Sequence, residues 1–158
     1  MKFDRLTKEQ FEELHKEFIN FLATQSITAD EWEDLKKNKP EAAEQELDVF
    51  SDLVWYGVLN KVEYLEHVSP QQLHLFKCGS THLHLIAIKL KNETIDFTTK
   101  SGFDWLRDNL LSDELEFYNA KKNYSEDKQQ DLFKLIQQGA NITKGELYRY
   151  FENLIDGN

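Results

Sequence analysis

The middle of the chain decides the fold, since residues 62–90 read VEYLEHVSPQQLHLFKCGSTHLHLIAIKL. Apolar residues alternate with polar ones in this stretch, and Ser69-Pro70 and Gly79-Ser80 are turn signals. The alternation here and further downstream predicts five short strands, over 62–68, 73–78, 82–90, 94–98 and 114–121.

The run 82–90 is apolar on both faces, which is typical of a central strand. A two-residue turn at Asn92-Glu93 predicts that this strand pairs with 94–98, with Ile88 opposite Phe97.

Helix patterns lie on both sides of the strands. Thr7, Thr28 and Thr143 each stand three residues before a Gln or Glu, which is the spacing of a capping box at a helix start. Ser101 and Ser125 are expected to cap two further helices. Apolar spacing then predicts helices over 8–25, 29–38, 41–60, 101–111, 125–139 and 144–155. Three N-terminal helices, a small, mainly antiparallel sheet and C-terminal helices indicate an α+β fold, and we expect one domain over 1–158.

Charge and composition exclude several classes of protein. The chain has 158 residues, 29 acidic and 19 basic side chains and a net charge of −10. Such a chain repels nucleic acid and anionic membranes unless a local basic patch attracts them. No apolar run approaches the roughly 20 residues of a membrane span, and the start of the sequence has no signal-peptide pattern. A single cysteine, Cys78, excludes an intrachain disulfide. We therefore expect a cytoplasmic protein without a cofactor or membrane partner.

The segment 74–84 offers one hypothesis for metal or thiol chemistry. Its candidate ligands are His74, Cys78, His82 and His84. A three-residue loop over 79–81 would pair Cys78 with His82 and bring all four side chains to one face of the sheet. A two-residue turn over 79–80 would pair Lys77 with His82 and place Cys78 and His74 on the opposite face. The sequence leaves the register open, and we favour the absence of a metal site.

Other catalytic patterns are incomplete or missing. Glu12-x-x-His15 has the spacing of one ligand pair of a di-iron site, but no second Glu-x-x-His exists. The sequence contains no nucleophile elbow and no glycine-rich phosphate loop. We therefore do not expect an enzyme.

Residues 140–153, ANITKGELYRYFEN, resemble the recognition-helix segment of tetracycline-repressor-type regulators, whose pattern runs Ala-Gly-Val-Ser-Lys-Gly-Thr-Leu-Tyr-x-x-Phe. The resemblance implies that Thr143, Lys144 and Tyr148 approach the DNA backbone, and Arg149 is a further candidate for nucleic-acid binding. In that family the motif lies near the N-terminus, whereas here it closes the chain. The last helix also carries a net negative charge, which is unfavourable in a DNA groove.

Over nearly its whole length the chain also resembles an uncharacterised family of short bacterial cytosolic proteins. Three segments carry the resemblance: LTKEQFEELHKEFINFLATQSITADEW at 6–32, QELDVFSDLVWYGVLNKVEYLEH at 45–67 and NITKGELYRYFENLI at 141–155. It implies a bacterial cytosolic protein and supplies no functional residues.

The favoured function is a non-catalytic protein–protein interaction module or adaptor. The helix over 41–60 is apolar on nearly every side after Glu46, so its extra apolar face either joins the core or meets a partner. Trp32, Trp55 and Trp105 are candidate partner-binding residues, because exposed tryptophans are frequent interface anchors. A DNA-binding regulator is the first alternative, and a metal- or Cys-dependent enzyme is the second. The identity of the partner and the oligomeric state stay open.

Overall fold

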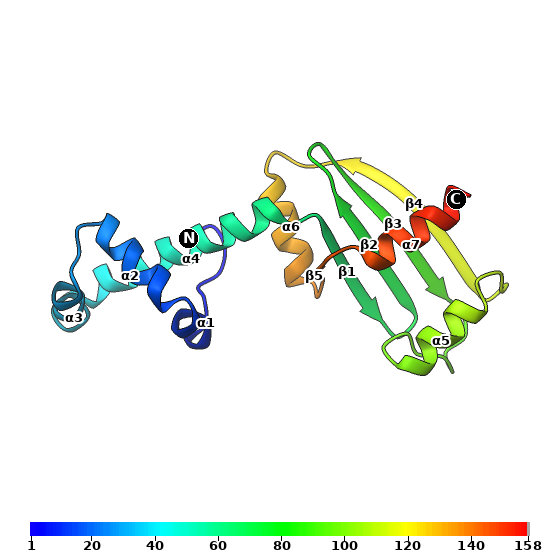
Figure 1. The fold of residues 1–158 in the computed structure, drawn as a ribbon, viewed down its shortest axis with the longest axis horizontal. Coiled ribbons are helices and arrows are strands. Elements are labelled where there is room, and N and C mark those ends of the chain that lie inside the picture. The colour runs from blue at the N-terminus through cyan, green and yellow to red at the C-terminus, as the bar shows by residue number, and fades with distance from the viewer. Residues whose placement is uncertain (158) are drawn as a thin grey trace. The chain divides into compact units, whose positions relative to one another are not determined.

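The computed structural model describes residues 1–157 of the chain. In this part, seven helices and five strands form two compact units, Met1–Asn60 and the described residues from Lys61 onward. The first unit is helical, and the second holds an antiparallel sheet with three helices (Figure 1). The predicted α+β class is confirmed. Within residues 1–157, no helix is both long enough and apolar enough to cross a membrane.

The helices of the first unit begin at two of the predicted caps. They are α1 (Lys8–Glu13), α2 (His15–Thr24), α3 (Ala29–Asn38) and α4 (Pro40–Lys61). Thr7 and Gln10 form a full capping box, because the side chain of each accepts a hydrogen bond from the backbone amide of the other. Thr28 caps α3 by accepting a hydrogen bond from the amide of Glu31.

The single helix predicted over 8–25 is instead two helices with a bend between them. Leu14, at the bend, has φ −101° and ψ 21°. The rings of Phe11 and Phe18 lie 5.7 Å apart, and their centroids are 5.9 and 5.1 Å from that of Phe50. Seven residues span about 10 Å in a straight helix. The bend therefore brings both rings onto the same residue of α4.

The second unit is built on a sheet with the strand order β4-β3-β2-β1-β5. The strands are β1 (Tyr64–Ser69), β2 (Gln72–Cys78), β3 (His82–Leu90), β4 (Leu115–Asn123) and β5 (Asn141–Thr143), and all neighbours are antiparallel. β3 pairs on both sides, and it buries Ile86 and Ile88 on one face and Leu83 and Ala87 on the other. Its predicted central position is confirmed.

Helices lie on both faces of this sheet. They are α5 (Lys100–Asp108), α6 (Lys128–Gln137) and α7 (Glu146–Ile155). α5 and α7 pack on one face, where the buried core includes Leu73, Leu75, Ile86, Ile88, Leu106, Tyr148 and Phe151. α6 contributes Leu135 to a hollow on the other face, beside Phe76 and Leu85.

The strand predicted over 94–98 is a loop in the structure. Asn92 and Asp96 each accept, through a side-chain oxygen, a hydrogen bond from the amide two residues later, at Thr94 and Thr98. Such local bonds fold the chain into turns that compete with a strand. Ile88 therefore faces Phe117 of β4, and Phe97 enters the core from the loop.

Two helix starts are shifted from their predicted residues. Thr99 caps α5 by accepting a hydrogen bond from the amide of Gly102, in place of the predicted Ser101. Asp127 caps α6, whereas Ser125 binds the carboxylate of Asp131 through its amide and hydroxyl. Both helices therefore begin at a residue two positions away from the predicted serine.

The predicted cap at Thr143 is also wrong, because Thr143 belongs to β5 and pairs with Tyr64 of β1. α7 starts after Gly145, which has φ +81°. A Cβ at this glycine would lie 2.4 Å from the Tyr64 ring, so only glycine fits the turn. A strand and a left-handed turn thus separate α6 from α7.

Candidate protein-interaction surface

α4 presents one apolar side to the core of the first unit. Ala43 and Phe50 are buried there, with Leu47, Val54 and Trp55 partly buried around them. Ser51 is fully buried, and its hydroxyl donates a hydrogen bond to the Leu47 carbonyl and accepts one from the Leu6 amide. This side of α4 is fully used by the fold.

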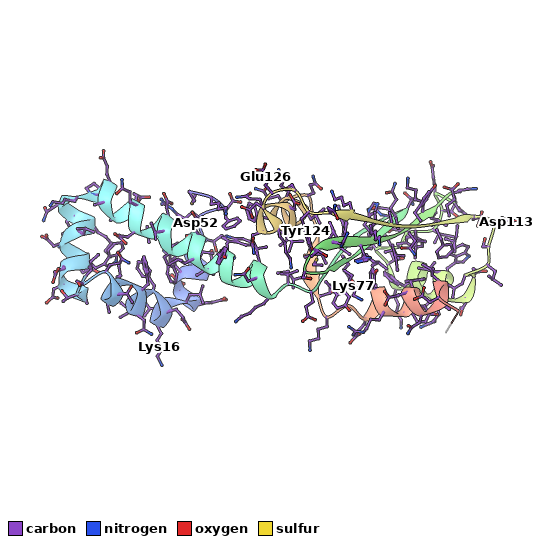
Figure 2. The ribbon with its side chains drawn as sticks, turned by 90° about the horizontal axis from the view of Figure 1, so that it is seen from above. Lys16, Asp52, Lys77, Asp113, Tyr124 and Glu126 are labelled. Carbon is purple, nitrogen blue, oxygen red and sulfur yellow. The ribbon has the colours of Figure 1, made fainter. Side chains whose placement is uncertain are left out.

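A second flank of α4 is covered by residues 1–6. Asp52, labelled in Figure 2, accepts hydrogen bonds from the backbone amides of Lys2 and Phe3, at 2.7 and 2.9 Å. One turn earlier, the Arg5 side chain donates to Asp48 at 2.8 Å and also pairs with Glu44. The side chains of Phe3 and Leu6 are buried. The start of the chain therefore packs along this flank and partly covers it.

The remaining side of α4 is apolar and uncovered. Val49, Leu53 and Tyr56 are 48%, 56% and 48% exposed. Their spacing of four and then three residues places them on one face of the helix. Solvent-facing positions of an amphipathic helix are normally polar. These three residues are called the α4 stripe below. Their apolar side chains are exposed to solvent and do not belong to the buried core of the first unit.

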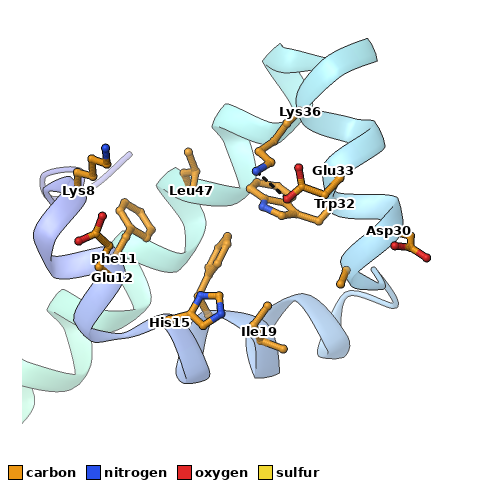
Figure 3. Close-up of a pocket in the computed structure, with 12 residues that line it drawn as sticks. Lys8, Phe11, Glu12, His15, Ile19, Asp30, Trp32, Glu33, Lys36 and Leu47 are labelled. Carbon is orange, nitrogen blue, oxygen red and sulfur yellow. Dashed lines mark ion pairs between the residues drawn. The ribbon is translucent and has the colours of Figure 1, made fainter.

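A hollow of about 550 Å³ opens on another side of this unit, between all four of its helices (Figure 3). Its apolar lining includes Phe11, Phe18, Trp32 and Leu47. At the rim, Lys36 pairs with Glu33 at 3.0 Å and lies over the Trp32 ring. Leu47 precedes Val49 of the α4 stripe by two residues, and two residues turn an α-helix by about 200°. The hollow and the α4 stripe therefore involve opposite sides of α4.

Glu12 and His15 are exposed at the rim of the same hollow. The bend at Leu14 puts them on different helices, α1 and α2. The helical spacing that suggested one ligand pair of a di-iron site is therefore interrupted.

None of the three candidate tryptophans is strongly exposed. Trp32 is 8% exposed and forms part of the core beside the hollow. Trp55 is partly buried against that core, and Trp105 is partly buried against the core of the second unit. Most of the exposed large apolar residues of the first unit are instead valine, leucine and tyrosine residues of α4.

The register of the β2–β3 hairpin divides the four candidate metal ligands. Cys78 pairs with Leu83 and Lys77 with His84, which differs from both registers considered from the sequence. His74 and Cys78 therefore lie on one face, and His82 and His84 on the other. Within residues 1–157, no three His, Cys, Asp or Glu side chains are close enough to hold a metal ion together.

The pKa values of His74 and Cys78, which share one face, are both shifted. His74 lies opposite His67, with ring centroids 6.4 Å apart. Burial, assisted by the nearby charges of His67 and Lys89, lowers the pKa of His74. Burial raises the pKa of Cys78 to about 12, with Lys128 opposing the shift. The thiol is therefore protonated at neutral pH and poorly suited to nucleophilic catalysis.

We expect Cys78 to react at least about 100-fold more slowly with a thiol reagent in the native protein than in concentrated urea, because the thiolate is rare and buried. Absorbance with Ellman's reagent measures both rates on one sample. Equal rates under the two conditions would show that the Cys78 thiol is as accessible and as easily ionised in the native protein as in the unfolded chain.

The segment 140–153 places its candidate DNA contacts in different surroundings. Tyr148 is 4% exposed and packs in the core, with its ring 5.7 Å from that of Tyr64. Thr143 is partly buried in β5, whereas Lys144 and Arg149 are exposed. Arg149 donates a hydrogen bond to the Lys144 carbonyl and lies over the Tyr64 ring. The burial of Tyr148 removes it from any surface that a DNA backbone would contact.

Comparison with known proteins identifies the family of the chain. The model of a family of unknown function, DUF6495, matches residues 1–156. The chain belongs to the DUF6495 family. No curated protein and no solved structure matches it. Membership of DUF6495 thus covers both units and assigns no residue a role.

The apolar excess of α4 is visible in the sequence, but the residues that present it to solvent are not. Phe50 and Leu53 look alike in a hydropathy pattern, yet they are 4% and 56% exposed. The hollow between the four helices had no signal in the sequence, because its lining residues come from segments far apart in the chain.

Proposed function

We propose that this protein is a non-catalytic protein–protein interaction module whose first unit binds an amphipathic helix of another protein along the α4 stripe. The observation that carries the proposal is the exposure of Val49, Leu53 and Tyr56 at helical spacing. Helix pairs bury such i, i+4, i+7 positions against each other. We further propose that it acts in the cytoplasm of a bacterium, in line with its resemblance to short bacterial cytosolic proteins.

Charge supports a partner helix with basic flanks. Residues 1–60 contain 14 acidic and 7 basic side chains, which gives a net charge of −7. Glu46 and Asp52 border the α4 stripe on its two sides, by their positions on the helix. Lys or Arg residues beside the apolar positions of a partner would be attracted to this unit and would favour association.

Replacing Leu53 by aspartate is expected to weaken partner binding at least about tenfold, because a charge would be buried in an apolar contact. Leu111→Asp is the matched control, since Leu111 is 99% exposed in the second unit and the chemical change is the same. The tagged full chain and both variants are used to capture partners from native cytosol, and quantitative mass spectrometry compares them. The proposal requires a partner that the wild type and Leu111→Asp retain and Leu53→Asp loses. Equal retention by all three would contradict it.

The alternatives receive less support from the geometry. DNA binding through 143–149 would have to proceed without Tyr148, which is buried. An enzyme built on 74–84 would have to work with His74 and Cys78 on the opposite face from His82 and His84.

A further inference from the structure

The outer edge of β4 is a long, open strand edge. β4 stands at one end of the strand order and, within residues 1–157, pairs only with β3 (Figure 1). It has nine residues, and from Phe117 to Asn123 all of them are exposed. The opposite edge strand, β5, has three residues. An open edge presents unpaired backbone N–H and C=O groups that another strand can bind.

We propose that β4 pairs with β4 of a second copy of this chain, antiparallel, about a two-fold axis that passes beside Asn119. Asn119 is the middle residue of the nine, so this axis pairs the two strands along their whole length. Residues facing each other across it lie on the same face of the sheet. The two five-stranded sheets then continue into one another, with α5 and α7 of both copies on the same side.

The charges of β4 complement themselves in this register. Glu116 lies opposite Lys122 of the partner subunit, and the two-fold axis repeats the pair. On the other face, Phe117 lies opposite Lys121 of the partner subunit, an arrangement suited to a cation–π contact. Opposite charges across neighbouring strands stabilise a sheet, and like charges destabilise it.

The two neighbouring registers, with the two-fold axis beside Tyr118 or Ala120, do not place Glu116 opposite a lysine of β4. An axis beside Tyr118 places Glu116 opposite Ala120 of the partner subunit, and an axis beside Ala120 places Tyr118 opposite Lys122 of the partner subunit. Both also leave the ends of the nine-residue strands unpaired. Length and charge therefore select the same register.

Lysines on an edge strand discourage indiscriminate strand addition. Lys121 and Lys122 have this effect on β4, whereas Glu116 supplies the complementary charge at its other end. Glu116 accepts a hydrogen bond from the Tyr118 hydroxyl at 2.6 Å and pairs with Lys91 at 3.2 Å. These contacts hold the carboxylate in place and lower its pKa, so it is charged at neutral pH. The edge is thus suited to its own copy rather than to an arbitrary strand.

Charge reversal tests the pairing. Glu116→Lys and Lys122→Glu each place like charges opposite each other twice, so each variant alone is expected to dimerise at least about tenfold more weakly than the wild type. An equimolar mixture of the two variants restores both opposite-charge pairs and is expected to form a heterodimer. Sedimentation equilibrium of the full chain compares the wild type, the two variants and their mixture. A wild type that stays monomeric, or variants that dimerise as well alone as in the mixture, would overturn the proposal.

A cysteine scan tests the axis. In a Cys78→Ala background, Asn119→Cys places a thiol opposite its own copy, and mild oxidation is expected to yield a covalent dimer. Asn123→Cys is the control, because the two thiols would then lie at opposite ends of the paired strands. Non-reducing electrophoresis compares the yields. Equal yields at the two positions, or no dimer from Asn119→Cys, would contradict this axis.

Discussion

Replacing Phe50 by alanine is expected to lower the free energy of unfolding of the first unit by about 3–5 kcal/mol, the usual range for a buried phenylalanine. Phe50 is 4% exposed. Its ring centroid lies 5.9, 5.1 and 5.4 Å from those of Phe11, Phe18 and Phe21. Alanine would leave a cavity at the point where α1 and α2 meet α4. A domain has only about 5–15 kcal/mol of stability, so the loss is severe.

Urea denaturation followed by tryptophan fluorescence measures this loss. A Trp105→Phe background restricts the signal to Trp32 and Trp55, which both belong to the first unit. Leu53→Ala, three residues further along α4, is the matched control. Leu53 is 56% exposed, so its truncation is expected to change stability by no more than about 0.5 kcal/mol. Similar effects of the two substitutions would contradict the assignment of one side of α4 to the core and the other to solvent.

Replacing Gly102 by alanine is expected to destabilise the second unit by about 3 kcal/mol, the upper end of the usual range for overpacking. A Cβ on Gly102 would lie 1.8 Å from the backbone oxygen of Asp96. That oxygen also accepts a hydrogen bond from the Thr99 hydroxyl at 2.7 Å. The backbone of the loop before α5 therefore has to move, and with it the buried Phe97.

Gly57→Ala is the matched control, and it is expected to raise the stability that Gly102→Ala lowers. Gly57 lies inside α4, and no heavy atom lies within 4 Å of the Cβ that alanine would add. Because glycine inside a helix is less favourable than alanine, this substitution is expected to stabilise the protein by up to about 1 kcal/mol. Thermal unfolding followed by circular dichroism compares both variants with the wild type. A stable Gly102→Ala variant would mean that α5 does not approach the loop as closely as the structure indicates.

The fold prediction succeeded where one signal was local and strong. The run 82–90 became β3 with the predicted bounds, because its apolar residues occupy both faces. The caps at Thr7 and Thr28 formed because all their hydrogen bonds lie within three residues. The prediction of a strand at 94–98 was wrong. The turn signal at Asn92-Glu93 gives no information on whether a strand about 25 residues further along the chain pairs with 82–90 instead. β4 took that place beside β3.

The candidate site was predictable only as a property of a helix. The apolar excess of 41–60 was visible, but its distribution between core and solvent was not. Covering one flank of α4 requires the contact of Asp52 with the amides of Lys2 and Phe3, about 50 residues earlier in the chain. The tryptophans were weaker guides, because a large apolar ring suits a core and an interface equally well.

By itself, the sequence determined the α+β class, the acidic charge, the positions of most helices and strands, and the presence of one cysteine. Periodicity, capping and composition are properties of neighbouring residues, and they can be read without knowing which segments meet. Only the tertiary structure decided that His74 and Cys78 face away from His82 and His84, that Tyr148 is buried, and that Val49, Leu53 and Tyr56 are exposed. These outcomes depend on strand register and on contacts between distant segments. A shift of one residue in register, or a different neighbour for one helix face, would reverse them while leaving the local pattern unchanged.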